Sequence, residues 1–148
     1  MDSALLVQVR DEIERLHRFF VRWFAGTVAE ADDVFEDGFF KHLDPGFLLI
    51  PPAGTITDLS GLGKIIRAAH GSNPDFRIAI RNASIRGTWD DHVLVTYEEW
   101  QRNALASSPP DNARVASAIF RSGESLKWLH VHETWLPKAV MEAGPYDF

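Results

Sequence analysis

The segment GESLKWLHVHETW, residues 123–135, combines a turn signal with a run of strand-forming residues. Its first residues are small and polar, and the aromatic and β-branched residues after them predict a strand over 126–136, which ends before Pro137. Successive residues of a strand point to opposite faces of a sheet. One face is therefore expected to carry Trp128, His130, His132 and Thr134, and the other Leu129, Val131, Glu133 and Trp135.

Three more long strands are expected upstream, at 75–87, 92–103 and 113–122. The connecting sequences TWDD, SSPPDN and SGES are turn signals. Sequential strands with short connections form an antiparallel meander. A shorter hairpin, with strands at 47–52 and 55–57, is predicted before them.

The N-terminal part of the chain is predicted to be helical. Residues 4–26 carry apolar side chains at helical spacing, namely Val9, Ile13, Leu16, Phe20 and Trp23. Asp2 or Ser3 is expected to cap this helix, and Gly26 suits a left-handed exit from it. A second helix is expected at 30–43, and a third at 59–71 after a cap at Asp58 or Ser60.

This order of elements predicts one domain, 1–148, of the α+β class. Three N-terminal helices would pack on one face of a curved antiparallel sheet. Residues 137–148 form a C-terminal tail after the last strand.

Composition excludes several classes of function. The net charge of −6, from 15 basic and 21 acidic residues, argues against a nucleic-acid partner. The absence of Cys excludes disulfides and thiolate chemistry and is compatible with a cytoplasmic protein. No stretch reaches the roughly 20 apolar residues that span a bilayer, and the N-terminus does not have a signal-peptide pattern. We therefore expect no membrane partner.

Two segments resemble the SnoaL-like branch of the nuclear-transport-factor-2-like (NTF2-like) superfamily. They are GESLKWLHVHETW and VLVTYEEW, residues 93–100, and the resemblance extends over about residues 4–137. It implies a cone-shaped, cystatin-like α+β barrel with a pocket between the helices and the concave face of the sheet. The convex face commonly packs against a second subunit. The superfamily includes isomerases, dehydratases, cyclases, transport adaptors and a kinase association domain, so the resemblance implies a fold rather than one activity.

Two carboxylates are the candidate catalytic groups. The resemblance places Val131, Glu133 and Trp135 on the pocket side, and strand alternation is expected to add Thr96, Glu98 and Ser117. Glu98 and Glu133 would then lie about 10 Å apart across one strand. Burial and repulsion would raise the pKa of at least one of them, as a general acid or base requires. Pairing with Arg114, Arg121 or an arginine of a helix as ordinary structure is the alternative.

Aromatic side chains are expected to complete the pocket and to form an interface. The expected ligand-binding residues are Phe20, Trp23, Phe39, Thr96, Ser117 and Trp135. On the opposite face, alternation places a flat aromatic patch that a monomer rarely exposes. We predict a homodimer through this patch, formed by Tyr97, Phe120, Trp128, His130 and His132.

Metal chemistry is not expected. His130 and His132 have the spacing of strand ligands, but no third ligand follows at a useful distance, and His92 belongs to a turn. The ketosteroid isomerase mechanism of the superfamily is also disfavoured. Its catalytic Asp falls at Pro51, and its two other functional groups fall near Ser117 and Phe19.

A dehydratase or cyclase would need a His–acid pair in the pocket. His17 would meet Asp37 or His42 in such a site, or it is a satisfied core histidine. Three functions therefore remain open. They are a pocket protein that binds a small hydrophobic or aromatic ligand, a cofactor-independent lyase or isomerase that uses a pocket Glu, and a plain dimerisation module whose cavity is filled by its own side chains.

Overall fold

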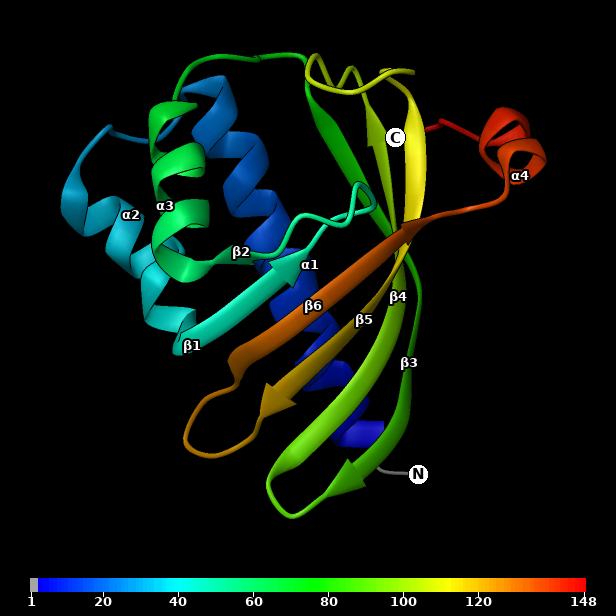
Figure 1. Ribbon diagram of the computed structural model, residues 1–148. Helices are drawn as coiled ribbons and strands as arrows, with labels where there is room; N and C mark the ends of the chain where they lie inside the picture. The colour runs from blue at the N-terminus through cyan, green and yellow to red at the C-terminus, as the bar shows by residue number, and fades with distance from the viewer. Residues whose placement is uncertain (1–2) are drawn as a thin grey trace.

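The computed structural model describes residues 3–148, and the expected cap at Asp2 lies outside them. Four helices and six strands follow one another as shown in Figure 1. The helices are α1 (Ser3–Ala25), α2 (Asp32–Gly38), α3 (Leu59–Ala68) and α4 (Lys138–Ala143), with a 3-10 turn at Phe40–His42. The strands are β1 (Leu43–Ile50), β2 (Thr57–Asp58), β3 (Arg77–Trp89), β4 (His92–Arg102), β5 (Asn112–Arg121) and β6 (Lys127–Trp135).

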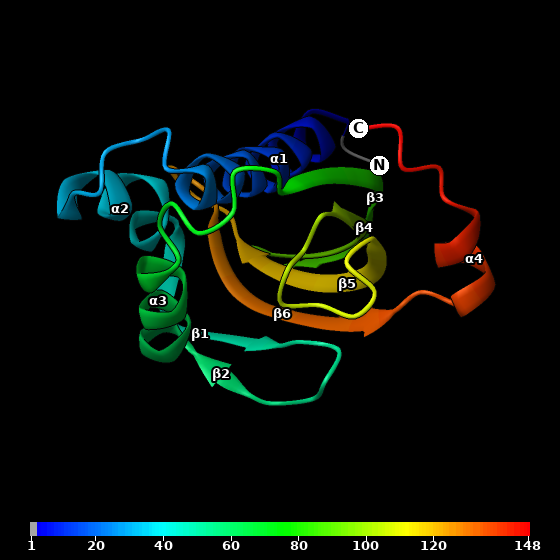
Figure 2. The same cartoon turned by 90° about the horizontal axis from the view of Figure 1, so that it is seen from above.

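The strands form one curved sheet in the order β2-β1-β6-β5-β4-β3. The predicted antiparallel meander is confirmed for β3 to β6. The prediction of a wholly antiparallel sheet is wrong, because β1 runs parallel to β6. Figure 2 shows α1 and α3 on the concave side of the sheet, which curves but does not close into a barrel. The α+β class and the cystatin-like arrangement are confirmed.

Helix α1 forms as its apolar spacing predicts. Val9, Ile13 and Trp23 are fully buried against the sheet and the other helices. The helix ends at Gly26, whose φ of 73° is the left-handed conformation that glycine tolerates best. The Trp23 indole donates to the Ile66 carbonyl at 2.8 Å, which joins α1 to α3.

Helix α3 begins at the predicted cap. The Asp58 carboxylate accepts a hydrogen bond from the Gly61 amide at 2.8 Å and so satisfies one free N–H of the first turn. The helix packs beside β1 and covers one end of the concave face (Figure 2). Its buried residue Ile66 faces the core.

A bulge in β6 changes which side chains face the core. The pairing with β5 shifts between Ile119 and Phe120, so that Leu129 is an extra residue in β6. Trp128 therefore shares the concave face with Val131 and is 1% exposed. Placing Trp128 on the convex face by simple alternation was wrong.

Phe120 and Tyr97 were also assigned to the wrong face. Both pack in the core, 0% and 2% exposed, with Phe120 4.4 Å from the Trp128 ring centroid. The inward and outward faces of β4 and β5 are therefore the reverse of the predicted ones. Tyr97 pairs with Ala116 and Val93 with Phe120, so all four side chains lie on the same, core-facing side of the sheet. Of the predicted interface residues, His130 and His132 alternate with buried Val131 and Glu133 and lie on the convex face.

The C-terminal tail folds back onto its own chain after α4. The Arg81 guanidinium lies over the Trp100 ring at 4.5 Å and the Phe148 ring at 5.7 Å. It also donates to the Pro145 carbonyl at 2.8 Å. With the Tyr146 ring beside it, Trp100 is 3% exposed.

Candidate active site

A cavity of about 190 Å³ lies between α1, α3, β1 and the concave face of the sheet. Most of its lining is apolar and includes five phenylalanine rings, those of Phe20, Phe24, Phe39, Phe47 and Phe76. The ionisable side chains in its lining are His17, Tyr97, Glu99, Arg114 and Glu133. The cavity therefore combines an apolar chamber with one group of ionisable residues.

His17 projects from α1 into this group and is 6% exposed. Its Nδ1 donates to the Ile13 carbonyl at 2.6 Å, and its Nε2 lies 3.0 Å from Glu99 Oε1. Since both partners are acceptors, the ring fits best as a doubly protonated imidazolium. Burial lowers the pKa of His17, but the charge and hydrogen bond of Glu99 outweigh it and raise that pKa overall.

Glu99 is the anion of this pair. It comes from β4, and its second oxygen accepts from Gln101 Nε2 at 2.6 Å. Burial acts to raise the pKa of Glu99, but the His17 charge and hydrogen bond, together with Arg114, lower it to about 2. Glu99 is therefore a permanent carboxylate near neutral pH, fixed by two hydrogen bonds.

Glu133 has the opposite behaviour. It projects from β6 and is 8% exposed. Burial, followed by the negative charge of Glu99, raises the pKa of Glu133 to about 7, and Arg114 and His17 oppose this shift. Two carboxylates in one cavity thus differ in charge state, which is the arrangement that separates an acid–base group from a fixed anion.

Arg114, on β5, lies between the two glutamates in the sheet order. Its Nη1 is 3.4 Å from Glu133 Oε1, and its Nη2 donates to Asn112 Oδ1 at 3.2 Å. The Trp135 ring lies 4.9 Å from its guanidinium carbon. Its Nε is buried and has no hydrogen-bond partner among residues 3–148.

Several predicted pocket residues lie elsewhere. Thr96, Glu98 and Ser117 are on the convex face, where Thr96 accepts from Arg86 and Glu98 from Asn82 and Trp100. These placements were wrong because β4 and β5 present their other sets inward: Val93, Val95, Tyr97 and Glu99 on β4, and Ala116, Ala118 and Phe120 on β5.

The predicted aromatic lining is partly found. Phe20, Phe39 and Glu133 line the cavity. Trp23 does not, because it packs between α1, α2 and α3 against Phe35 and His70. Trp135 is 43% exposed and covers the outer side of Arg114 instead of the chamber.

The assignment of strand faces from the sequence missed Glu99 and Gln101, whereas Arg114 had been named as a structural partner of the glutamates and does contact Glu133. Glu98 and Glu99 are adjacent in the strand, so one of the two carboxylates had to face the cavity whichever face of β4 pointed inward. This adjacency was the feature of the sequence that could have indicated Glu99. His17 was considered with Asp37 or His42, but His42 contacts the Asp37 carbonyl at 2.8 Å instead. The acid that His17 meets comes from β4, not from α2.

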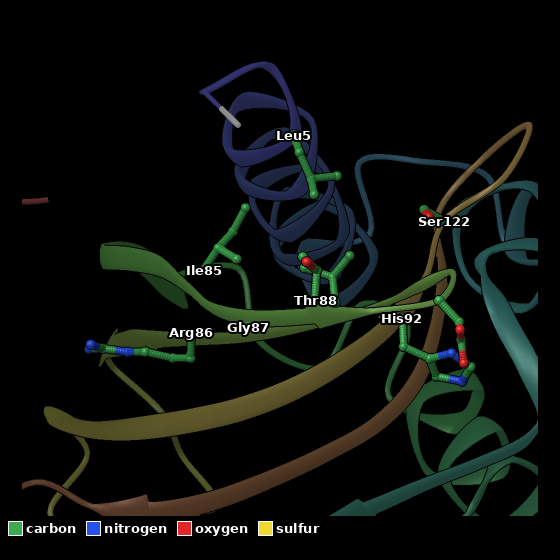
Figure 3. Close-up of a pocket in the computed structure, with 9 residues that line it drawn as sticks. Leu5, Ile85, Arg86, Gly87, Thr88, His92 and Ser122 are labelled. Atoms are coloured by element: carbon green, nitrogen blue, oxygen red, sulfur yellow. The ribbon is translucent and has the colours of Figure 1, made fainter. Parts of the chain in front are cut away.

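A second hollow of about 530 Å³ lies between the start of α1 and the β3–β4 hairpin. Figure 3 shows Leu5, Ile85 and Thr88 on the helix side of the hairpin, whereas Arg86 and His92 extend in different directions. These polar side chains do not converge on one point. The hollow therefore has no arrangement comparable to the acid–base group.

Neither a metal cluster nor a membrane helix is found in residues 3–148. Within that range, no three or more His, Asp or Glu side chains are grouped to hold a metal ion. None of the helices in this part of the chain is long and apolar enough to cross a bilayer.

Comparison with curated proteins gives one partial relative. No protein-family model matches the chain. Sucrose-phosphatase 1 of Nicotiana tabacum is 24% identical over 143 residues, which covers 87% of this chain and 31% of the phosphatase. The chain thus spans about a third of the length of this relative.

Solved structures show the fold. An NTF2-like protein of unknown function from Pseudomonas aeruginosa superposes with a TM-score of 0.75 at 24% identity, covering 88% of this chain and 99% of that one. A proposed dehydratase of the NTF2-like family from Streptomyces avermitilis gives 0.68 at 14% identity, covering 90% and 97%. The CaMKII hub of S. rosetta gives 0.67 at 12% identity, covering 87% and 95%. The chain therefore has the NTF2-like fold, and the superfamily resemblance is confirmed at this level.

Proposed function

We propose that the protein is a cofactor-independent lyase or isomerase of the SnoaL-like type that moves a proton on a small, largely apolar molecule. The observation that carries this proposal is a nearly buried carboxyl, Glu133, in an apolar cavity beside a fixed imidazolium–carboxylate pair, and these surroundings raise its pKa to about 7. A general acid or base works best when its pKa is near the working pH.

Each residue of the group has a role in this proposal. Glu133 accepts or donates the proton. The negative charge of Glu99 raises the proton affinity of Glu133, against the opposing charge of His17, and the fixed pair orients a polar group of the substrate. The aromatic lining holds the apolar part, and 190 Å³ limits it to a molecule smaller than the ligands of typical pockets of about 300–1,000 Å³.

Deuterium exchange tests the proposal without a known substrate. Small cyclic ketones and keto acids are incubated with the protein in D₂O near neutral pH, and loss of the C–H signal is followed by ¹H NMR. We expect exchange faster than in buffer, reduced about 10²–10⁴-fold by Glu133→Gln. Glu98→Gln is the matched control, since Glu98 lies on the convex face. Equal exchange in Glu133→Gln and wild-type protein would contradict the role of Glu133.

Binding without catalysis is the second candidate function. The hydrogen bonds of the His17–Glu99 pair to the rest of the protein favour this function. His17 bonds to the Ile13 carbonyl and Glu99 to Gln101, so both side chains are held in place and can orient a ligand without transferring a proton. Compounds of the same panel that bind by calorimetry but show no exchange at any pH would support this candidate over the enzyme. The cavity of 190 Å³ argues against the third alternative, a chamber filled by its own side chains.

We further propose that two copies associate through the convex face. Leu94, Ile119 and His130 lie in one row across β4, β5 and β6 and are half-buried, with His132 further along β6. The likeness to the CaMKII hub supports self-association of this fold. Sedimentation equilibrium should give a dimer that Ile119→Asp dissociates. A monomeric wild-type protein would contradict the proposal.

A further inference from the structure

We infer that the molecule bound in the cavity carries a carboxylate and that the Arg114 guanidinium binds it. The inference rests on the proposed function in placing a ligand in this cavity, and it adds the chemical class of that ligand. Its evidence is the incomplete pairing of Arg114.

Arg114 is a nearly buried cation with few good partners. Its side chain is 11% exposed. Among residues 3–148 its one contact with a carboxylate is the single Nη1–Oε1 distance of 3.4 Å to Glu133, whereas Arg–carboxylate pairs are frequently bidentate at about 2.7–2.9 Å. Asn112 supplies a neutral acceptor at 3.2 Å, and Nε has no partner among the described residues. The fork of donors therefore has unused capacity.

The charges around Glu133 leave this cation without a full counter-ion. Helix α1 contributes His17, β4 contributes Glu99 and Tyr97, and β5 contributes Arg114, whereas α3 and β1 contribute apolar side chains to the cavity. His17 and Glu99 neutralise each other at 3.0 Å. When Glu133 is protonated, Arg114 carries an uncompensated positive charge in a low-dielectric site. Such a charge is costly unless an anion joins it.

The rest of the lining defines the kind of acid. The chamber is small, and apart from Arg114 and the His17 already paired with Glu99 its lining has no basic side chain among the described residues. A second acidic group on the ligand would therefore have no counter-ion there. A monocarboxylate with a compact ring or branched chain fits these surroundings, with its carboxylate on Arg114 and its apolar part among Phe20, Phe39 and Phe47. Glu133 must be neutral to avoid repelling it, so binding is coupled to a proton on Glu133.

Calorimetry with benzoate and benzamide tests the inference, because the two probes have nearly the same shape and differ in charge. We expect benzoate to bind more tightly than benzamide below neutral pH, and to lose affinity about tenfold per pH unit above the Glu133 transition, since each unit removes the required proton. Arg114→Gln should weaken benzoate about 10- to 100-fold and leave benzamide almost unchanged. Arg86→Gln, an exposed arginine outside the cavity, is the control.

The Glu133→Gln variant distinguishes carboxylate binding by Arg114 from proton transfer by Glu133. This variant removes the proton-transfer group, so exchange activity is lost, but it keeps the cavity neutral at that position. Benzoate should still bind to it, without the pH dependence. Equal affinity for benzoate and benzamide, no saturable binding of benzoate, or benzoate binding unchanged in Arg114→Gln would each overturn the inference, whatever the exchange experiment shows.

Discussion

His17 Nε2 lies 3.0 Å from Glu99 Oε1, and this contact joins helix α1 to strand β4 across the core. Both side chains are less than 10% exposed, 7% and 9%, so neither charge is solvated by water. The pair is held at both ends, by the Ile13 carbonyl on one side and by Gln101 on the other. It is therefore a structural connection, and it also fixes the Glu99 charge that adds to the effect of burial in raising the pKa of Glu133.

Breaking this pair should destabilise the fold. Glu99→Gln leaves a buried histidine without its counter-ion, and we expect a loss of about 3–5 kcal/mol in the free energy of unfolding at pH 5.5, measured by urea denaturation. Arg18→Gln is the control, since Arg18 belongs to an exposed pair with Glu14 at 3.8 Å and should change stability by less than about 1 kcal/mol. Equal effects of the two substitutions would contradict this account.

The pair also sets a pH window. The lowered pKa of Glu99 contributes stability above its ordinary value of 4.5 that is lost as the pH falls toward about 2. The raised pKa of His17 contributes stability that is complete below 6.5 and is lost as the pH rises through the folded value. The stabilisation by this pair should therefore be greatest between pH 4.5 and 6.5. A wild-type minus Glu99→Gln difference that grows above pH 8 would contradict it.

Glu133 should titrate near neutral pH and destabilise the protein when it ionises. Its folded pKa of about 7 is above the ordinary 4.5, so its contribution to stability is complete below 4.5 and is lost as the pH rises through 7. As the pH rises from 5 to 8, the free energy of unfolding of Glu133→Gln should increase by about 1–3 kcal/mol relative to that of the wild type. Chemical denaturation at several pH values measures this, with Glu98→Gln as the control. A flat difference across that range would refute the shifted pKa.

Two neighbours should move the Glu133 transition in opposite directions. Glu99→Gln removes a negative charge and should lower the pKa of Glu133, whereas Arg114→Gln removes a positive charge and should raise it. Carboxyl ¹³C NMR of the variants measures both changes. Absence of a shift in both variants would show that burial alone governs the pKa of Glu133, and shifts of the same sign would contradict the assigned charges.

Gly63 should resist substitution although it lies in a helix. A Cβ there would be 2.5 Å from the Phe40 ring, so the packing of α3 against Phe40 would have to open. We expect Gly63→Ala to cost about 1–3 kcal/mol by thermal denaturation, in spite of the better helix propensity of Ala. Gly123→Ala, with no atom nearer than 4.0 Å, is the control and should be close to neutral.

Local patterns predicted the elements because helices and strands depend on neighbours along the chain. The stripe of Val9, Ile13 and Trp23 placed α1, and the small polar turns placed the four long strands. The resemblance at β6 put Glu133 on the correct face. Each of these patterns involves only a few neighbouring residues, so it can be recognised in a single sequence.

The inward faces of β4 and β5 were decided by tertiary structure alone. Both sets of β4 are apolar enough to be buried, with Val93, Val95 and Tyr97 on one side and Leu94 and Trp100 on the other. The alternation of faces along a strand also cannot predict that the C-terminal tail covers Trp100. Nor can it predict the extra residue, Leu129, in β6. A shift of one residue exchanges the faces of a strand, and only the pairing of distant strands specifies it.

The sequence by itself determined the helices, the strand meander, the NTF2-like resemblance and the candidacy of Glu133. The folded chain decided that Glu99, not Glu98, is its partner in the cavity, that His17 is the counter-ion of Glu99, and that Arg114 lies among them. The physical reason is one of range. Periodicity and turn chemistry are local, but a site is assembled from residues 82 positions apart, whose meeting depends on the register of the whole sheet.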